Sequence, residues 1–553
     1  MNFATLLLAL AAQSASAATE APSSFEDRLK HATGPAQLKQ LQTWCTKNNL
    51  AEEKKRLQEL LSKAAAPPKP AADTPQREAA RGAGDQARQV VSDYRDGRAK
   101  AVGEEVRKVI AWMKTEKYAP SDARERVTTL VRGLLVDEPA DRSALEAELK
   151  AVEHAERPGE ELKKSAYSFD NQIKSILKKF TGQIFNAVEK CIAAGEAGYA
   201  FDLYRFLLQA DPENERAHKS LGEQKIDNRW MRPFEQDQWK AGLAWDEKGG
   251  WVPVKSRERL DQGEIYDTET KQWGKGQDLD KQHAEVAKPW RMESEHFQLI
   301  STADHTVNVK LLARMEAFFL QAFRQYDLFF AGKNASKNAS LIFGVVPAKK
   351  KLVVNFYRSE QQFKEHANPP TTWAAGFYSG GKHASFFYGG GGSRDFSIEL
   401  MQHELTHQIL GEYSDGGRGG GPWLTEGAAV FLESAEFRNG TLSLGDLKDN
   451  RDIADYRRNL RAGQKEHSLK TMLETFGARG EWDQGDISKN YRGAGATVYF
   501  LMHFDGGRYR ADTIQLLRDA YFGQPRPVEE YFGISVAGLS FLMERFYKEC
   551  DIP

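Results

Sequence analysis

Two histidines and a glutamate occur within five consecutive positions at the start of HELTHQILGEY, the stretch from His403 to Tyr413. His403 and His407 are four residues apart, so on a helix they lie one turn apart and face the same way. Two imidazoles in this arrangement can chelate one Zn²⁺ ion from a single rigid element. Glu404 lies about 100° round the helix, too far for easy ligation but within reach of a water on the metal. The alternative is a polar patch on a surface helix.

The HExxH pentapeptide alone does not establish a metal site. In a chain with twelve histidines it occurs by chance in roughly one or two chains per hundred, so a third ligand has to decide between the two interpretations. Glu426, in PWLTEGAAVFLES, is separated from His407 by eighteen residues. The helical spacing of apolar residues in this stretch predicts a second helix with Glu426 near its start. A His₂Glu set leaves the fourth zinc position to water, which distinguishes a catalytic site from a structural one. Glu433, two turns further along the same face, either orients a ligand histidine or is a surface carboxylate.

The elements that must position these residues have an α+β pattern from Pro289 onward. Ser393 or Asp395 is the predicted N-cap of a long helix that begins near Phe396 and carries the histidines. The stretch AGFYSGGKHASFFYGGGG is predicted to form a hairpin that turns at Gly380-Gly381 and leads into this helix. Strands are predicted at residues 296–303, 340–347 and 351–357, and helices at residues 308–330 and 359–366.

The HELTHQ and WLTEGAAVFLE boxes together resemble the gluzincin metallopeptidases. The aminopeptidase-N branch is the most similar, because it has the same His-to-Glu spacing and a Trp-Leu-x-Glu-Gly box. The chain from Pro289 to its end also resembles an exported bacterial gluzincin-like family of unassigned function, frequent among planctomycete-type bacteria and often preceded by tetratricopeptide-like helices. The resemblance implies an α+β fold with a zincin-like catalytic domain, a small mixed sheet plus helices. It implies Glu404 as general base and three Zn²⁺ ligands: His403, His407 and Glu426.

The same resemblance implies a tyrosine or histidine that stabilises the oxyanion from a later helix. NYRGAGATVYFLMHF, from Asn490 to Phe504, is similar to the aminopeptidase segment that carries this tyrosine. Tyr491 is therefore the candidate. The register relative to the Gly-Ala pair differs from that of the family, so Tyr499 and His503 are kept as alternatives.

One departure from the family concerns substrate binding. Aminopeptidases of this type have a Gly-x-Met-Glu-Asn box on the strand before the zinc helix, whose glutamate grips the substrate's free amine. The region here, HASFFYGGGG, contains no carboxylate, which favours an endopeptidase-like or unusual specificity. Arg394 and Arg418 are candidates for binding a substrate carboxylate instead. HASFFY either forms an exposed edge strand that pairs with an extended peptide or packs its aromatic residues under the sheet.

The first residues of the chain indicate export. MNFATLLLALAAQSASA combines an apolar run with Ala15-Ser16-Ala17, which is typical of a secretory signal peptide and predicts a periplasmic, cell-surface or secreted protein. The apolar run is too short for a permanent membrane anchor. A formal net charge of -1 gives no reason to expect nucleic-acid binding. Three widely spaced cysteines allow at most one disulfide.

The chain upstream of the zinc motifs is predicted to be helical and then β-rich. GEAGYAFDLYRFLLQADPENERAHKSLG resembles a tetratricopeptide-type hairpin, which makes the helical region a candidate site for a protein partner. Four clustered tryptophans with Gly-Gly turns predict a small β module built round them, with stacking on sugars as the alternative. The predicted divisions are a signal peptide (1–17), an N-terminal helical segment (18–63), a Pro/Ala linker (64–75), a helical region (76–226), a Trp-rich β module (227–285) and the zinc domain (286–553).

The sequence as a whole predicts an exported zinc metallopeptidase that acts on polypeptides. Glu404 would take a proton from a zinc-activated water and deliver it to the leaving amine, with Tyr491 stabilising the oxyanion. Two alternatives are kept: a catalytically vestigial envelope scaffold that binds partners, and a zinc hydrolase of a non-peptide amide such as a cell-wall linkage. The intact Glu404 argues against the scaffold.

Overall fold

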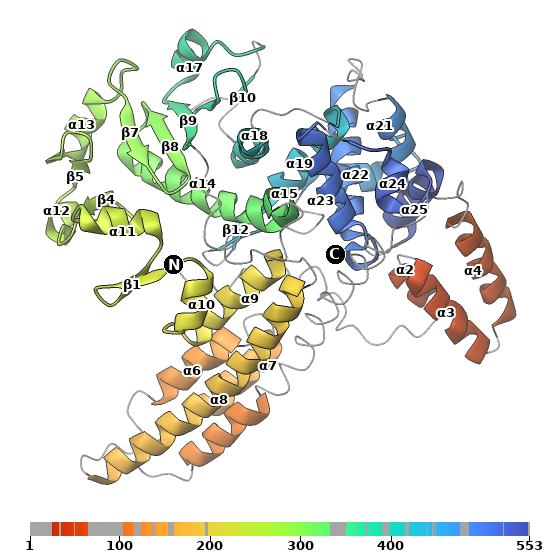
Figure 1. Cartoon of the computed structure of the whole chain (residues 1–553), viewed down its shortest axis with the longest axis horizontal. Coiled ribbons are helices and arrows are strands. Elements are labelled where there is room, and N and C mark those ends of the chain that lie inside the picture. The colour runs from red at the N-terminus through yellow and green to blue at the C-terminus, as the bar shows by residue number, and fades with distance from the viewer. Residues whose placement is uncertain are drawn as a thin grey trace.

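The computed structural model describes residues 25–32, 35–48, 50–64, 103–114, 123–134, 139–152, 160–193, 197–331, 350–371, 374–389, 397–414, 420–438, 441–444, 447, 450–475, 486–523 and 525–550. Within these ranges the fold is α+β, with small sheets and many helices (Figure 1). The predicted signal peptide, most of the predicted linker, the strand predicted at residues 340–347, Arg394 and Arg418 lie outside them. None of the helices described combines the length and apolarity that a bilayer crossing requires.

The largest sheet among the described residues has the strand order β10-β11-β9-β8-β7. β7 (Trp290–Glu293) and β8 (Phe297–Ser301) form a hairpin. α14 (His305–Gln325) and α15 (Asp327–Ala331) then begin the connection from β8 to β9 (Leu352–Tyr357), and such a crossover allows these two strands to run parallel. The strands predicted at residues 296–303 and 351–357 are confirmed, and so is the helix at 308–330, which the structure divides into α14 and α15.

β10 (Gly376–Ser379) and β11 (Ala384–Tyr388) form the predicted hairpin, with residues 380–383 as the turn. β11 pairs on its other side with β9, and all its residues are buried. β10 is therefore the edge strand on this side of the sheet, with β7 at the opposite edge, and the alternative that places HASFFY at an exposed edge is wrong. The aromatic residues of β11 pack on both faces of the sheet, partly against α17 (Glu360–Ala367).

The two helices predicted from the zinc motifs are present as α18 (Ile398–Tyr413) and α19 (Pro422–Glu433). The N-cap of α18 is Ser397, and neither Ser393 nor Asp395. Its extended backbone lets the hydroxyl accept a hydrogen bond of 3.0 Å from the N–H of Leu400. α19 begins after Gly421, whose φ of +77° favours glycine, and Pro422 occupies its first turn.

α22 (Ile487–Gly507) packs against α19 with the two backbones in close contact. A Cβ atom at Gly427 would lie 2.6 Å from the carbonyl oxygen of Ala494, and a Cβ atom at Gly495 would lie 2.4 Å from Cγ1 of Val430. Both distances are shorter than van der Waals contact, so the close crossing of the helices requires glycine at both positions.

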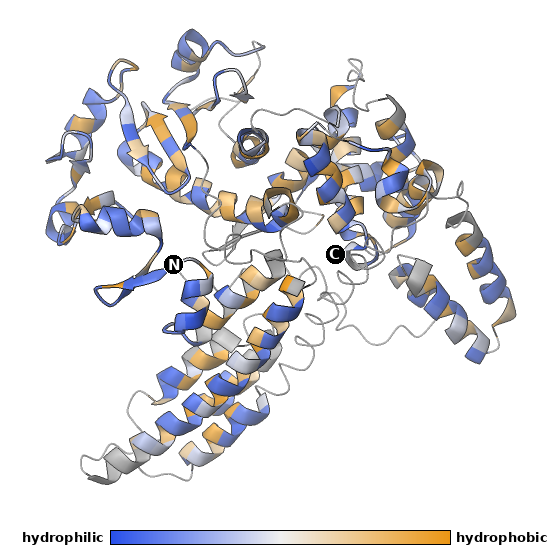
Figure 2. Ribbon diagram, viewed as in Figure 1, coloured by the Kyte–Doolittle hydropathy of each residue, from blue (hydrophilic) through white to orange (hydrophobic). Residues whose placement is uncertain are grey.

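The remaining elements of this half of the chain pack round α22 and the sheet. One hydrophobic cluster extends from β7 through the site helices to the last helix, and apolar residues gather on the sheet strands and on α19 (Figure 2). The site helices are therefore held by a core that they share with both the sheet and the C-terminal helices. These further elements are β12 (Ala435–Arg438), β13 (Thr441–Leu444), α20 (Arg451–Arg461), α21 (Leu469–Thr475), α23 (Arg510–Tyr521), α24 (Val528–Phe532) and α25 (Val536–Glu549).

The helical region packs against the part of the chain that contains the sheet and α18, because Phe323 of α14 belongs to the core of the helical region. α9 and α10 form the predicted helical hairpin, and Asn214 caps α10 by accepting from the N–H of Ala217 at 3.0 Å. The helices of this region are residues 103–114, α6 (Ala123–Leu134), α7 (Pro139–Lys150), α8 (Glu160–Ala193), α9 (Ala197–Ala210) and α10 (Glu215–Ser220).

The first three helices described, α2 (Phe25–His31), α3 (Pro35–Lys47) and α4 (Ala51–Ala64), have a separate small core. They lie against the C-terminal helices, where Arg545 of α25 donates to the carbonyl oxygens of Ala32 and Leu29 at 2.7 and 3.2 Å. The first and last described helices of the chain are therefore neighbours.

Residues 224–282 form three consecutive ββα units, where the sequence predicted one β module. Their second strands place Trp230, Trp251 and Trp273 at equivalent positions, 21 and 22 residues apart. The units are β1 (Gln224–Ile226), β2 (Arg229–Met231) and α11 (Pro233–Lys240); β3 (Leu243–Asp246), β4 (Gly250–Pro253) and α12 (Arg257–Asp261); β5 (Glu264–Asp267), β6 (Gln272–Lys275) and α13 (Gly276–Gln282).

The tryptophans of these units make the contacts between one unit and the next. Each of them, and Trp290 of β7, packs on the element that precedes its own strand pair: Trp230 on His218 (4.3 Å between ring centroids), Trp251 on Phe234 (5.6 Å), Trp273 under Arg259 (5.3 Å to the ring centroid) and Trp290 on His283 (3.9 Å). Packing between units therefore accounts for Trp230, Trp251 and Trp273, and the array links α10 to the sheet.

Candidate metal centre

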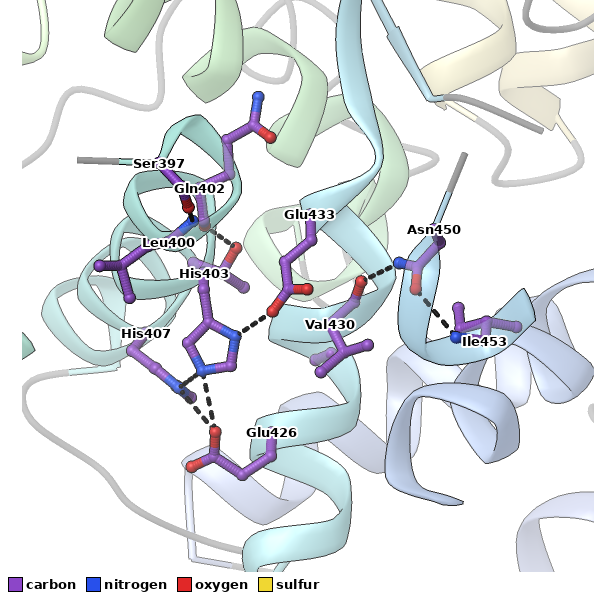
Figure 3. Close-up of polar contacts among 12 residues, drawn as sticks. Ser397, Leu400, Gln402, His403, His407, Glu426, Val430, Glu433, Asn450 and Ile453 are labelled. Carbon is purple, nitrogen blue, oxygen red and sulfur yellow. Dashed lines mark hydrogen bonds and ion pairs between the residues drawn. The ribbon is translucent and has the colours of Figure 1, made fainter. Parts of the chain in front are cut away.

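α18 and α19 bring three potential ligand atoms together (Figure 3). Nε2 of His403 lies 3.0 Å from Oε2 of Glu426, and Nε2 of His407 lies 3.2 Å from the same oxygen. The two imidazole nitrogens are 3.1 Å apart. Within the described part of the chain, these three residues form the group of metal-ligating side chains whose ligand atoms converge. The structure thus brings the predicted third ligand to the predicted pair.

The spacing of these atoms fits a tetrahedral zinc site. Ligand atoms on a tetrahedron with bonds of about 2.0–2.1 Å lie roughly 3.3 Å apart, and the three observed separations are 3.0, 3.1 and 3.2 Å. Two imidazole nitrogens and one carboxylate oxygen are also a donor set that Zn²⁺ accepts in enzymes. His403, His407 and Glu426 are therefore the residues that would hold the ion.

Glu433 holds the first histidine from its other side. Its Oε1 lies 2.6 Å from Nδ1 of His403, so that this nitrogen donates to the carboxylate while Nε2 faces Glu426 (Figure 3). The Glu433 side chain is only 20% exposed, which is not the position of a surface carboxylate. A carboxylate behind a ligand histidine fixes the ring and makes it a stronger ligand.

The charges of these groups depend on one another. Burial by itself lowers the pKa of His403, but the hydrogen bonds to Glu426 and Glu433 outweigh it and hold that pKa well above its ordinary value. Burial opposes ionisation of Glu426, but His407 and His403 outweigh this effect and lower the pKa of the carboxyl group. Zinc that binds here must therefore displace a proton from His403.

Glu404 lies on the face of α18 that is turned toward the sheet. Its Oε2 accepts a hydrogen bond of 2.8 Å from the main-chain N–H of Tyr378 on β10. Burial raises the pKa of Glu404, although the nearby histidines His403 and His407 oppose the shift. The carboxylate is next to the ligand set but is not a member of it, as its helical position predicts.

Tyr491 is the oxyanion candidate that lies beside the ligands. Its ring centroid is 5.8 Å from that of His403. Burial and the carboxylates of the site raise the pKa of Tyr491, so its phenol keeps its proton at neutral pH. Tyr499 and His503 are about two and three turns further along α22, where their rings pack 6.2 and 5.6 Å from that of Phe431.

Two further side chains near Glu404 were not predicted from the sequence. The hydroxyl of Tyr378 donates to Oε1 of Glu412 at 2.6 Å, and Nδ1 of His383 lies 3.1 Å from the same carboxylate. Glu412 follows Glu404 by eight residues and therefore lies on the same face of α18. The eight-residue spacing of Glu404 and Glu412 is the sequence signal that could have predicted a second contact between α18 and the sheet.

The comparison with known proteins adds no relative to this description. No protein-family model matches the chain, and no curated protein matches it.

Proposed function

We propose that this protein is an exported zinc-dependent peptidase, related to the gluzincins, that hydrolyses peptide bonds with Glu404 as general base. The observation that carries the proposal is the convergence of His403, His407 and Glu426 from two helices, with their ligand atoms 3.0–3.2 Å apart. Glu404 lies next to this set without belonging to it, and its carboxylate is held by the N–H of Tyr378, which supports its assignment as the base.

The roles of the side chains follow from this geometry. Zn²⁺ bound there supplies a Lewis acid that polarises a carbonyl group and lowers the pKa of water. Glu404 takes the proton of the attacking water and passes it to the leaving amine. Glu433 keeps the proton of His403 on Nδ1, which leaves Nε2 as the ligand atom. Tyr491, which stays protonated, donates a hydrogen bond to the oxyanion.

The arrangement of the elements supports the zincin-like assignment for residues 286–553. The edge strand of the sheet lies beside the helix that carries HExxH, and the third ligand comes from the next helix. An extended peptide would pair with β10, which is the edge strand beside α18, and not with β11. β10 reads GFYS and, like HASFFY, has no carboxylate to bind a free amine, which favours an endopeptidase-like specificity. The N-terminal sequence supports export.

Metal analysis and digestion of a diverse peptide library by the protein lacking residues 1–17 test this proposal. We expect about one zinc per chain, the stoichiometry of a single His₂Glu site. Glu404→Gln keeps its zinc and loses cleavage by about 10²–10⁴-fold, the usual contribution of a general base. Glu365→Gln, which changes an exposed glutamate on α17, leaves both properties unchanged.

Two results would contradict the proposal. One is cleavage that persists in Glu404→Gln, which would remove this residue from the mechanism. The other is a zinc-loaded protein that cleaves no peptide; hydrolysis of cell-wall amides by that same protein would then support the non-peptide alternative.

A further inference from the structure

Tyr378 makes three separate contacts with the helix that carries the histidines, although it belongs to the edge strand β10. Its main-chain N–H donates to Glu404, its hydroxyl donates to Glu412, and its ring lies against Gly411. Residues 404, 411 and 412 lie on one face of α18, because they are separated by seven and eight positions. The contacts therefore extend over two turns of the zinc helix.

The contact with Glu404 involves the main chain of a paired strand. Oε2 of Glu404 accepts from the N–H of Tyr378 at 2.8 Å, and this N–H cannot rotate away, because Tyr378 is paired with Ser385 of β11. The bond fixes one carboxylate oxygen of Glu404 and so determines where the other oxygen, Oε1, is directed. A fixed donor of this kind restricts a catalytic group more tightly than a side-chain donor does.

The side chain of Tyr378 sets the position of the strand on the helix. Its hydroxyl is 2.6 Å from Oε1 of Glu412. Glycine at position 411 leaves room for the ring, because a Cβ atom there would lie 3.1 Å from the hydroxyl oxygen and 3.3 Å from Cε1. The neighbouring strand is attached one turn lower, where Oγ of Ser385 donates to Gln408 at 2.9 Å. The hairpin is thus attached to α18 at two successive turns, at Gln408 and at Glu412.

We propose that Tyr378 is a positioning residue for the general base. Its hydroxyl donates to Glu412 and its ring lies over Gly411, which fixes the position of β10 along the axis of α18. Its main-chain N–H then orients the carboxylate of Glu404. In this role Tyr378 acts on catalysis through the carboxylate of Glu404. The role rests on the proposed function, in which Glu404 is the base.

Steady-state kinetics of four variants test the catalytic part. Since small displacements of a catalytic group are costly, Tyr378→Phe and Glu412→Ala are expected to lower kcat by about tenfold, with KM and zinc content unchanged. Glu412→Gln retains an acceptor oxygen and restores kcat to within about twofold of the wild type. Glu365→Gln, which changes an exposed glutamate on α17 away from the site, is the control and leaves kcat unchanged.

Hydrogen exchange of the segment 374–389, followed by mass spectrometry, tests the contact without any substrate. Glu404→Ala removes the acceptor of the Tyr378 N–H, so one amide of this segment is expected to exchange faster. Unchanged exchange in Glu404→Ala overturns the positioning role, and so does an unchanged kcat in both Tyr378→Phe and Glu412→Ala. If Glu404→Ala speeds exchange but the wild type hydrolyses nothing, the contact stands and the proposed function fails.

Discussion

At the scale of single residues, the candidate centre combines ligands that the sequence motifs identify with hydrogen-bond partners that only the tertiary structure brings near. His403 illustrates both, because Nε2 meets Glu426 and Nδ1 meets Glu433 at 2.6 Å. The histidine pair follows from its spacing on one helix, which needs no tertiary information. The contact between Tyr378 and Glu404 has no such signal, since it joins a main-chain N–H to a side chain from another element.

Substitution of Glu433 tests whether its hydrogen bond to Nδ1 of His403 strengthens zinc binding. We expect Glu433→Ala to weaken zinc binding by about 10–100-fold, the usual loss when the carboxylate behind a ligand histidine is removed. Glu433→Gln still accepts a hydrogen bond from Nδ1 and loses less. Competition with a chromophoric chelator measures both affinities. An unchanged affinity in Glu433→Ala would show that the ring of His403 is held without this contact.

The second residue-scale prediction concerns acid stability. Burial on α22, helped by the charge of Arg510, lowers the pKa of His503 to about 3, compared with about 6.5 in an unfolded chain. The unfolded state therefore binds the extra proton first, so the contribution of His503 to stability is largest above pH 6.5 and is lost as the pH falls toward 3. Between pH 6.5 and 5 this group alone removes up to about 2 kcal/mol.

Urea denaturation at pH 7.5 and pH 5 measures this effect. We expect the free energy of unfolding to fall less between these two pH values in His503→Phe than in the wild type, because phenylalanine cannot take up the proton. Equal losses in the two proteins would mean that His503 is not buried in its neutral form.

At the scale of elements, the sequence predicted the helices and the hairpin of the site but not how they pack. The helix that carries the histidines begins two residues later than expected, because Ser397 is the residue whose hydroxyl caps it. HASFFY was ambiguous, since a short apolar run fits both an edge strand and a buried one. The three ββα units were missed because the four tryptophans from Trp230 to Trp251 suggest a single cluster, which hides the period of 21 and 22 residues that relates Trp230, Trp251 and Trp273.

The crossing of α19 and α22 gives a prediction at this scale. Gly427→Ala places a Cβ atom 2.6 Å from the carbonyl oxygen of Ala494, so the helices must separate at a cost of about 1–3 kcal/mol. Because Gly427 follows the ligand Glu426, zinc affinity is expected to fall as well. Thermal unfolding and zinc titration measure the two effects.

Gly182→Ala is the matched control for this crossing. Gly182 lies in α8, and a Cβ atom there meets nothing within 4 Å. The substitution is therefore expected to leave zinc affinity unchanged and to stabilise the helix by up to about 1 kcal/mol. Equal behaviour of the two alanine variants would show that the crossing does not depend on glycine.

At the scale of the whole molecule, the C-terminal helix α25 contacts the first described helices of the chain. Arg545 is 3% exposed and donates to the carbonyl oxygens of Ala32 and Leu29. Composition and helical periodicity separate the first helices from the zinc domain, but they contain no signal for a hydrogen bond between residues more than 500 positions apart. Only the folded chain reveals that these two parts are in contact.

Replacement of this arginine tests the attachment of the first helices. Arg545→Met removes the side-chain donor of the Ala32 carbonyl group, at a cost of about 1–3 kcal/mol where that group is buried. The carbonyl group of Leu29 also loses this donor but still accepts from the N–H of Ala32 at 3.2 Å. A protease site placed between residues 70 and 71 allows the chain to be cut there. We expect the cut fragments of the otherwise unchanged protein to co-elute in size-exclusion chromatography and those of Arg545→Met to separate. Arg257→Met, at an exposed position of α12, serves as the control and co-elutes.

The contact between Arg545 and the first helices also sets an order of events during biosynthesis. The ribosome makes α2 before α25, so Arg545 cannot donate to the carbonyl oxygens of Leu29 and Ala32 until α25 has been synthesised. A chain that is truncated before α25 lacks Arg545 and cannot form these hydrogen bonds. Its first three helices then keep exposed the face that contacts α25 in the complete fold.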